Sequence, residues 1–211
     1  MLLVRDVRQD SLAGELARLE LQGLDTIQVS ASHFQAMVAL AKSEQSAFSR
    51  DTYEPGHFTA SAFVLSPDKK KLLLILHRKL NLWLQPGGHI EPTDQNVIEA
   101  ARREVMEETG LRALTLESSV FDLDVHLIPA WGDSPAHFHH DVRALFVAAN
   151  LELKASAEVA EARWFDLEKV VACADDLGEG KGTDESVLRV ARRLLRLKSP
   201  PLFPIPPAVN T

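Results

Sequence analysis

The sequence predicts an α/β protein (α+β) whose strands and helices follow a helical N-terminal extension. Two observations support this class. Up to about residue 50, apolar residues recur three and four positions apart, the period of an amphipathic helix. From His57 onwards, stretches rich in β-forming residues alternate with helical ones. We expect a helical extension over residues 1–52, a main domain over 53–198 and a Pro-rich tail over 199–211.

Two helices are expected in the extension. Ser11 precedes one leucine repeat, and Ser30 or Ser32 precedes an apolar repeat over residues 34–41. A serine side chain accepts a hydrogen bond from the free N–H groups that begin a helix, so each is a candidate cap. Neither helix carries a chemical cluster, and we interpret the extension as a packing or dimer-forming segment.

The main domain is expected to alternate strands, turns and helices. Its predicted elements, in order, are strands at 57–65 and 71–78, a helix at 94–109, strands at 114–130 and 139–153, a strand and helix within 163–174, and a helix capped by Thr183 or Asp184. Gly110 directly follows the first of these helices, the usual place for a C-terminal glycine.

The tail has five prolines in its last twelve residues and cannot form a helix or a central strand. It is either a loose tail or an extended arm lying on a neighbour. Together with the helical extension, it favours a homodimer.

The bulk composition excludes several classes of protein. Hydrophobic residues make up 45% and charged residues 25%, an ordinary mixture for a globular domain. The net charge of -7 opposes non-specific nucleic-acid binding, so no nucleic-acid partner is expected. No stretch approaches the roughly 20 apolar residues of a membrane span. With Cys173 alone, no intrachain disulfide can form, and a cytoplasmic location is expected.

The most informative segment is GGHIEPTDQNVIEAARREVMEETGL, residues 87–111. Residues three and four apart share a helix face, so Glu104 and Glu108 stack and Glu107 stands beside them. Three crowded carboxylates repel one another by about 1 kcal/mol per pair in water, and several-fold more near a protein surface. A bound divalent cation relieves that repulsion, and Mg²⁺ or Mn²⁺ suits an all-oxygen cluster.

Two flanking features strengthen this interpretation. Arg103 lies one turn before Glu107 and can pair with it, which would hold that carboxylate in place. Gly87 and Gly88 allow backbone conformations closed to other residues, so that a carbonyl or amide can approach a metal or a phosphate. A solvated acidic helix end would explain the glutamates alone but not this combination.

The segment resembles the signature of the Nudix hydrolase family, G-x5-E-x7-R-E-U-x-E-E-x-G-U with U aliphatic. The stretch from Arg103 to Leu111 matches without a gap, and Gly87, Gly88 and Glu91 match the upstream GG-x-x-E form. Fourteen residues separate Gly88 from Arg103, one more than in the pattern. The early glutamate position is filled by Asp94 or Gln95, either as a shorter substitute or, for Asp94, as a helix cap.

The resemblance implies a fold and a reaction. The fold is an α/β/α sandwich with a mixed sheet. The reaction is attack of water on a phosphorus of a nucleoside diphosphate linked to a group X, with Mg²⁺ or Mn²⁺ as cofactor. The substrate would be a small-molecule diphosphate, most simply a nucleotide derivative. The general base stays open between a box glutamate and a carboxylate or imidazole of another loop, with Glu158 among the candidates.

The same resemblance implies the roles of the site residues. The catalytic set is Arg103, Glu104, Glu107 and Glu108. The metal ligands would be the three glutamates and the backbone carbonyl of Gly88. The residues expected to face the substrate are Gly87, Gly88, His89, His139 and Asp141.

A second cluster precedes a predicted strand. In a strand, His137, His139 and Asp141 would share one face, with His126 on the paired strand. Such a set could ligate a transition metal, contact a phosphate or supply a base. It could equally be a surface hairpin with ordinary histidines.

Three functions compete. The first is a metal-dependent diphosphohydrolase. The second is a non-catalytic nucleotide-sensing or binding module, whose mark would be lost box carboxylates or a fused DNA-binding domain. The third is an isomerase of allylic diphosphates on the same fold, which would need a further catalytic pair that the sequence does not reveal.

Overall fold

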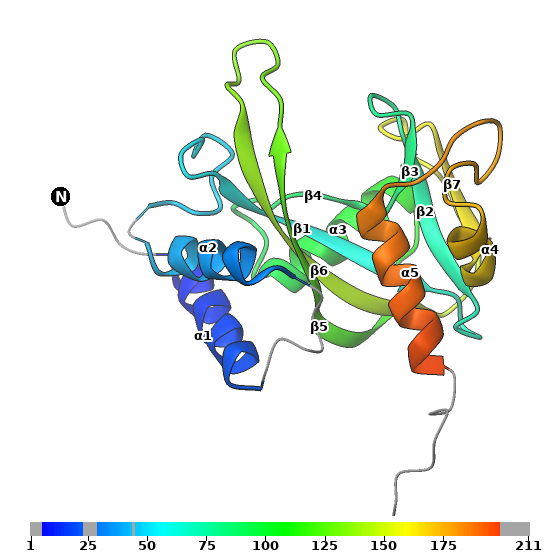
Figure 1. Ribbon diagram of the computed structural model, residues 1–211, viewed down its shortest axis with the longest axis horizontal. Coiled ribbons are helices and arrows are strands. Elements are labelled where there is room, and N and C mark those ends of the chain that lie inside the picture. The colour runs from blue at the N-terminus through cyan, green and yellow to red at the C-terminus, as the bar shows by residue number, and fades with distance from the viewer. Residues whose placement is uncertain (1–5, 23–28, 44, 199–211) are drawn as a thin grey trace, which may run out of the picture.

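The computed structural model describes residues 6–22, 29–43 and 45–198 and forms the predicted α/β/α sandwich (Figure 1). Tail residues 199–211, including the expected extended arm, lie outside the described residues. The elements in chain order are α1 (Val7–Gln22), α2 (Ala31–Lys42), β1 (His57–Leu65), β2 (Lys71–His77), β3 (Leu82–Leu84), β4 (Gly87–His89), α3 (Val97–Thr109), β5 (Leu114–Ile128), β6 (His137–Ala148), β7 (Glu161–Asp166), α4 (Leu167–Ala172) and α5 (Glu185–Lys198).

The sheet is mixed, as expected. Its order is β3-β2-β1-β6-β5, with β4 paired to β1 and β7 paired to β2. The β1–β6 pair is parallel, and the other named strand pairs are antiparallel. The hairpin of β5 and β6 is long and projects past the rest of the sheet (Figure 1). Register places His57 of β1 opposite His139 of β6.

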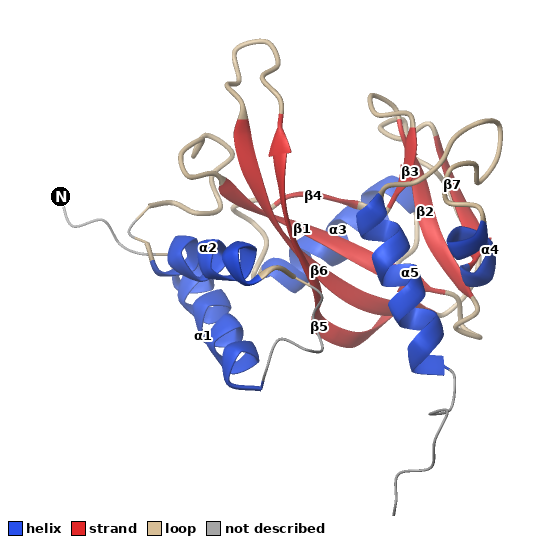
Figure 2. Ribbon diagram, viewed as in Figure 1, coloured by secondary structure: helices blue, strands red, loops and turns tan. Residues whose placement is uncertain are grey.

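Two apolar clusters occupy the two faces of the sheet, and helices lie over both faces (Figure 2). Alternation along β1 sends Phe58, Ala60 and Ala62 into the cluster that contains α1, α2 and α3. The same alternation sends Phe63 and Leu65 into the cluster with α4 and α5. Thr59 and Ser61 lie two and four residues before Phe63, so their side chains point to the same face of the sheet, the face covered by α5.

The helix boundaries follow the caps, with two corrections. Ser30 caps α2 and Asp184 accepts a bond from Val187 N at 2.8 Å, as predicted, and Gly110 ends α3 with φ 78°. However, α3 begins at Val97 rather than at Asp94, because Asn96 accepts the capping bond from Glu99 N. Helix α1 begins at Val7, so Ser11 lies inside it.

The extension is tied to the loop that precedes α3. Arg8 of α1 donates through Nη1 to the carbonyls of Glu91 at 2.8 Å and Asp94 at 2.9 Å. Leu12 and Leu16 of α1 are buried in the same cluster as Val97 and Val105 of α3. The helical extension is thus part of the scaffold around the box. Across the described ranges, no helix has both the length and the apolar character to cross a bilayer.

Candidate metal and substrate site

Strand β4 and helix α3 place the box residues against each other. Glu108 accepts a hydrogen bond through Oε2 from Gly87 N at 3.1 Å. A Cβ added at Gly88 would lie 2.6 Å from Oε1 of Glu104. Because real Cβ atoms do not approach an oxygen so closely, any side chain at position 88 would require the Glu104 carboxylate to shift. The two glutamates one turn apart therefore face the double-glycine strand.

Arg103 connects the parts of the box. Its guanidinium donates to Glu104 Oε1 at 2.9 Å, to Glu107 Oε2 at 2.8 Å and to the carbonyl of His89 at 2.9 Å. Its Nε and Nη2 reach the two oxygens of Asp94, each at 3.0 Å. The bond with Asp94 is the main reason that the pKa of Arg103 is raised. A permanently charged, planar group thus orients two carboxylates and the loop.

Asp94 resolves the ambiguity about the early glutamate position. It lies six residues after Gly88, where the family pattern has glutamate, and it is 7% exposed. Besides Arg103, it accepts a bond from Glu91 N at 2.7 Å. Asn96 caps the helix, so Asp94 acts as the shorter substitute. The additional residue relative to the pattern lies between Asp94 and Arg103.

Burial makes the carboxylate cluster unfavourable without a cation. The side chain of Glu107 is 45% exposed, whereas that of Glu104 is 12% exposed and Glu108 as a whole is 8% exposed. Burial, and then the charge of Glu104, raise the pKa of Glu108 to about 8. Burial also raises the pKa of Glu104, and the charge of Glu158 adds to the effect on both groups. The electrostatics favour a bound positive charge.

Comparison with known proteins identifies the family to which a site of this geometry belongs. A family model described as the NUDIX domain matches residues 55–188, and the chain belongs to this family. The m7GpppN-mRNA hydrolase NUDT17 of Xenopus laevis is 32% identical over 137 residues, covering 58% of this chain and 46% of the relative. The same-named protein of Danio rerio is 30% identical over 155 residues, covering 63% and 49%. The chain spans about half the length of these curated relatives.

Two further comparisons are narrower. A putative 8-oxo-dGTP diphosphatase of Bacillus subtilis is 40% identical over 57 residues, covering 26% of this chain and 38% of the relative. Among solved structures, the NUDIX domain of Shewanella oneidensis NrtR, complexed with ADP ribose, superposes with a TM-score of 0.51. It is 17% identical and covers 81% of this chain and all of that one, which supports the fold alone.

The histidines gather at one end of the sheet, next to the box loop. The ring of His57 lies 5.1 Å from that of His89 and 4.8 Å from that of His139. His137 and His126 lie 5.1 Å and 5.6 Å from His139, measured between ring centres. Sequence spacing does not join His57 to the cluster. The β1–β6 register does so.

Burial favours the neutral form of three rings in this cluster, those of His57, His89 and His139. Burial lowers the pKa of His57, of His89 to about 4 and of His139 to about 2. Arg50 lies against His89, with Nη2 3.2 Å from Nδ1. His89 and His139, the two histidines predicted to face the substrate, lie side by side, with their ring centres 5.2 Å apart.

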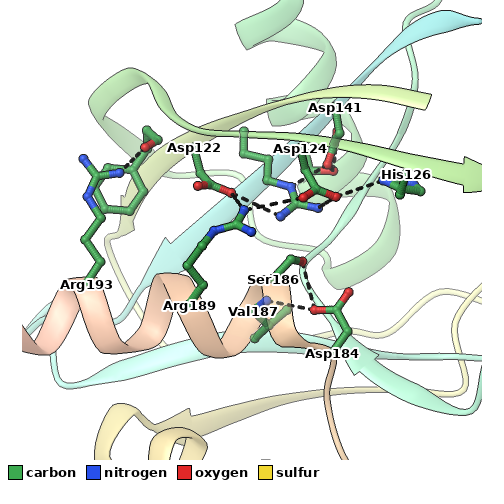
Figure 3. Close-up of polar contacts among 12 residues, drawn as sticks. Asp122, Asp124, His126, Asp141, Asp184, Ser186, Val187, Arg189 and Arg193 are labelled. Atoms are coloured by element: carbon green, nitrogen blue, oxygen red, sulfur yellow. Dashed lines mark hydrogen bonds and ion pairs between the residues drawn. The ribbon is translucent and has the colours of Figure 1, made fainter. Parts of the chain in front are cut away.

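Asp141, which was also predicted to face the substrate, lies in a buried ion network (Figure 3). It is 2% exposed, and its Oδ2 accepts from Arg143 at 2.7 Å. Its oxygens also accept from the hydroxyls of Thr59 and Ser61. Arg143 in turn pairs with Asp122 and Asp124, and Arg189 of α5 completes the network. The network thus joins β1, β6, β5 and α5, and Asp141 does not line the cavity beside the histidines.

A cavity of about 370 Å³ opens beside the histidines. His89, His137 and His139 line it together with two cations, Arg50 and Lys79. Trp131, on the hairpin loop between β5 and β6, also lines it and is 74% exposed. Sequence reasoning did not single out these last three residues. The signal that could have pointed to Trp131 is its position in a loop between two predicted strands, where a large apolar side chain is not needed for the core.

Proposed function

We propose that this chain is an Mg²⁺- or Mn²⁺-dependent hydrolase that cleaves a diphosphate linkage in a nucleoside-diphosphate-X type substrate. The observation that supports this most is the arrangement of Arg103 with Glu104, Glu107 and Glu108 against the Gly87–Gly88 strand. It packs an oxygen-rich cluster of box carboxylates against a strand of two glycines. The homodimer and the cytoplasmic location expected from sequence stay predictions.

The donor set fits a hard divalent cation. All the candidate side-chain donors are carboxylate oxygens, which Mg²⁺ and Mn²⁺ prefer. Burial disfavours the charge of Glu104 and Glu108, and a cation would reverse that effect. Glu104, Glu107, Glu108 and the Gly88 carbonyl would hold it. When bound, the cation neutralises phosphate charge and lowers the pKa of the attacking water.

The remaining side chains would bind and orient the substrate. Arg103 keeps Glu104 and Glu107 in fixed positions. Arg50 and Lys79, which line the cavity beside His89, would attract the negative charge of a diphosphate. Trp131 offers an exposed indole face for a nucleobase. Two of the curated relatives are named for capped mRNA and for 8-oxo-dGTP, which supports a substrate that contains a nucleotide here.

The test is a panel of nucleoside diphosphate derivatives with Mg²⁺ and with Mn²⁺, following phosphate released after phosphatase coupling. The wild-type chain should turn over at least one member only when metal is present. Glu108→Gln should lower kcat by roughly 100-fold or more, because removing one transition-state charge contact has effects of that size. Circular dichroism should show that the fold of this variant is unchanged.

Glu99→Gln is the matched control. Glu99 lies on the same helix, pairs only loosely with Arg102 at 3.5 Å and is 46% exposed. This variant should keep wild-type turnover. Full metal-dependent activity in Glu108→Gln would overturn the assignment. Tight binding of a nucleotide with no turnover across the panel would instead favour the sensing module.

A further inference from the structure

Three imidazoles from two strands converge at the histidine-rich end of the sheet. His57, His137 and His139 each offer a ring nitrogen, and these nitrogens all lie within 4.8 Å of one another. His57 begins β1 and is opposite His139 of the parallel strand β6. His137 is two residues earlier on β6 and so shares the face of His139. The trio is distinct from the box, whose donors are carboxylates of α3.

Backbone carbonyls determine the tautomers of two of these rings. Nδ1 of His57 lies 3.1 Å from the carbonyl of Thr52, and Nδ1 of His137 lies 2.8 Å from that of Pro135. A carbonyl only accepts, so each Nδ1 carries the hydrogen and donates it. Each Nε2 then presents a lone pair. A hydrogen bond from the far nitrogen of the ring to a carbonyl or carboxylate is the usual support of a metal-binding histidine.

One of these lone pairs has no partner among the described residues. His57 is fully buried, and its Nε2 makes no hydrogen bond with any residue that the structure describes. Buried polar atoms are rarely left in this state without a ligand or a functional reason. The other two Nε2 atoms, of His137 and His139, lie 3.3 Å apart. Zn–N bonds of ~2.0–2.1 Å in a tetrahedral site separate two nitrogens by about 3.3–3.4 Å. The spacing of this one pair, which is also within hydrogen-bonding distance, suits a shared ion.

We propose that His57, His137 and His139 form a second metal site, one that takes a transition metal of the Zn²⁺ class. Imidazole nitrogens suit Zn²⁺, whereas Mg²⁺ requires oxygen ligands, so the two sites would select different ions. Three protein ligands leave a fourth position open. His137 and His139 line the cavity that also contains Arg50 and Lys79, from which water or an anionic group could reach that position.

The experiment measures metal binding without substrate, so its result is independent of the hydrolase proposal. The box is first removed as a competing site with the Glu104→Gln, Glu107→Gln and Glu108→Gln triple variant. After chelation and dialysis, this protein is titrated with Zn²⁺ alone by calorimetry, and with Co²⁺ alone by visible spectroscopy. We expect one equivalent of each ion, and Co²⁺ bands typical of a tetrahedral, nitrogen-rich site.

Adding His139→Gln or His137→Gln to this background should weaken Zn²⁺ binding by at least about 100-fold and abolish those bands, since loss of an outer-shell partner alone costs 10–100-fold. His33→Gln is the control, because His33 is exposed on α2 and absent from the trio. It should change neither signal. Failure of the background protein to bind one equivalent, or binding that survives both histidine variants, would overturn the proposal. Thermal unfolding of each variant checks that the fold is retained.

Discussion

Arg103 and Asp94 form a bidentate ion pair across the box, with both nitrogen–oxygen distances at 3.0 Å. Asp94 occupies the position where the family pattern has glutamate, although the loop is one residue longer. The same guanidinium holds Glu104 and Glu107. The position of the proposed metal ligands therefore depends, through Arg103, on Asp94, which we infer to be a positioning residue.

Asp94→Asn should separate this positioning role from a merely structural one. The amide keeps the shape but loses the charge, so Arg103 loses its fixed orientation. We expect a stability loss of about 1.5–3 kcal/mol, the value of a hydrogen bond to a charged group. We expect Mg²⁺ affinity to fall roughly 10- to 100-fold, as for other outer-shell changes. Urea unfolding and metal titration measure the two effects.

Asp94→Glu should recover part of the metal affinity, because it restores the carboxylate. Asp175→Asn, at an exposed position, should change neither quantity. Equal metal affinity in Asp94→Asn and the wild type would show that Arg103 does not need this partner.

Gly88→Ala tests the close approach to Glu104. The added Cβ would lie 2.6 Å from Oε1, so the carboxylate must move. A displacement of about 1 Å at a catalytic group can lower the rate about 100-fold, and we expect kcat to fall by this order while the protein remains folded. Steady-state kinetics with Mg²⁺ provide the measurement.

Gly14→Ala is the control for a glycine without close neighbours. It lies in α1, and an added Cβ there meets no atom within 4 Å. This variant should keep full activity and gain about 0.5–1 kcal/mol, because alanine favours a helix more than glycine does. Similar kinetics for both variants would contradict the proposed contact at Gly88.

Glu108 should make the stability of the metal-free protein depend on pH. Its pKa in the folded chain is raised from 4.5 to about 8, chiefly by burial. The unfolded chain loses the proton first, so the stabilisation is complete below the ordinary pKa and disappears as pH rises through the raised value. With a chelator present, the melting temperature of Glu108→Gln minus that of the wild type should increase over this interval and then level off.

Metal should reverse this pH effect in the wild type only. Adding Mg²⁺ above pH 8 should raise the melting temperature of the wild-type chain and leave Glu108→Gln nearly unchanged, because the variant lacks the charged oxygen. A pH-independent difference between the two proteins in chelator would mean that Glu108 titrates normally.

Arg8→Gln should show that the N-terminal extension supports the box. Arg8 donates to two carbonyls of the loop that contains Asp94, and glutamine is too short to keep both bonds. We expect kcat/KM to fall about 10-fold, with a stability loss of about 1–2 kcal/mol. Arg18→Gln, on the exposed face of the same helix, is the control. An unchanged kcat/KM in Arg8→Gln would limit α1 to packing.

The sequence by itself determined the features that depend on local spacing. The helical period aligned Glu104 with Glu108 and placed Arg103 one turn from Glu107, and local cap chemistry located Ser30, Asp184 and Gly110. These features involve residues at most four positions apart, whose relative placement follows from backbone geometry. The start of α3 was missed by three residues because Asp94 and Asn96 are both good caps, and a partner distant in sequence engages Asp94.

Only the tertiary structure decided the features that depend on strand register. The β1–β6 pairing brought His57 to His139, and it placed Asp141 beside Thr59 and Ser61, in a buried network instead of the cavity. Packing of α1 brought Arg8 to the box loop. Residues so far apart along the chain meet only when the strands pair in the correct register. A shift of register by one residue would move every side chain of a strand to the opposite face. The register is selected by the packing of the whole core, and no local sequence pattern specifies it.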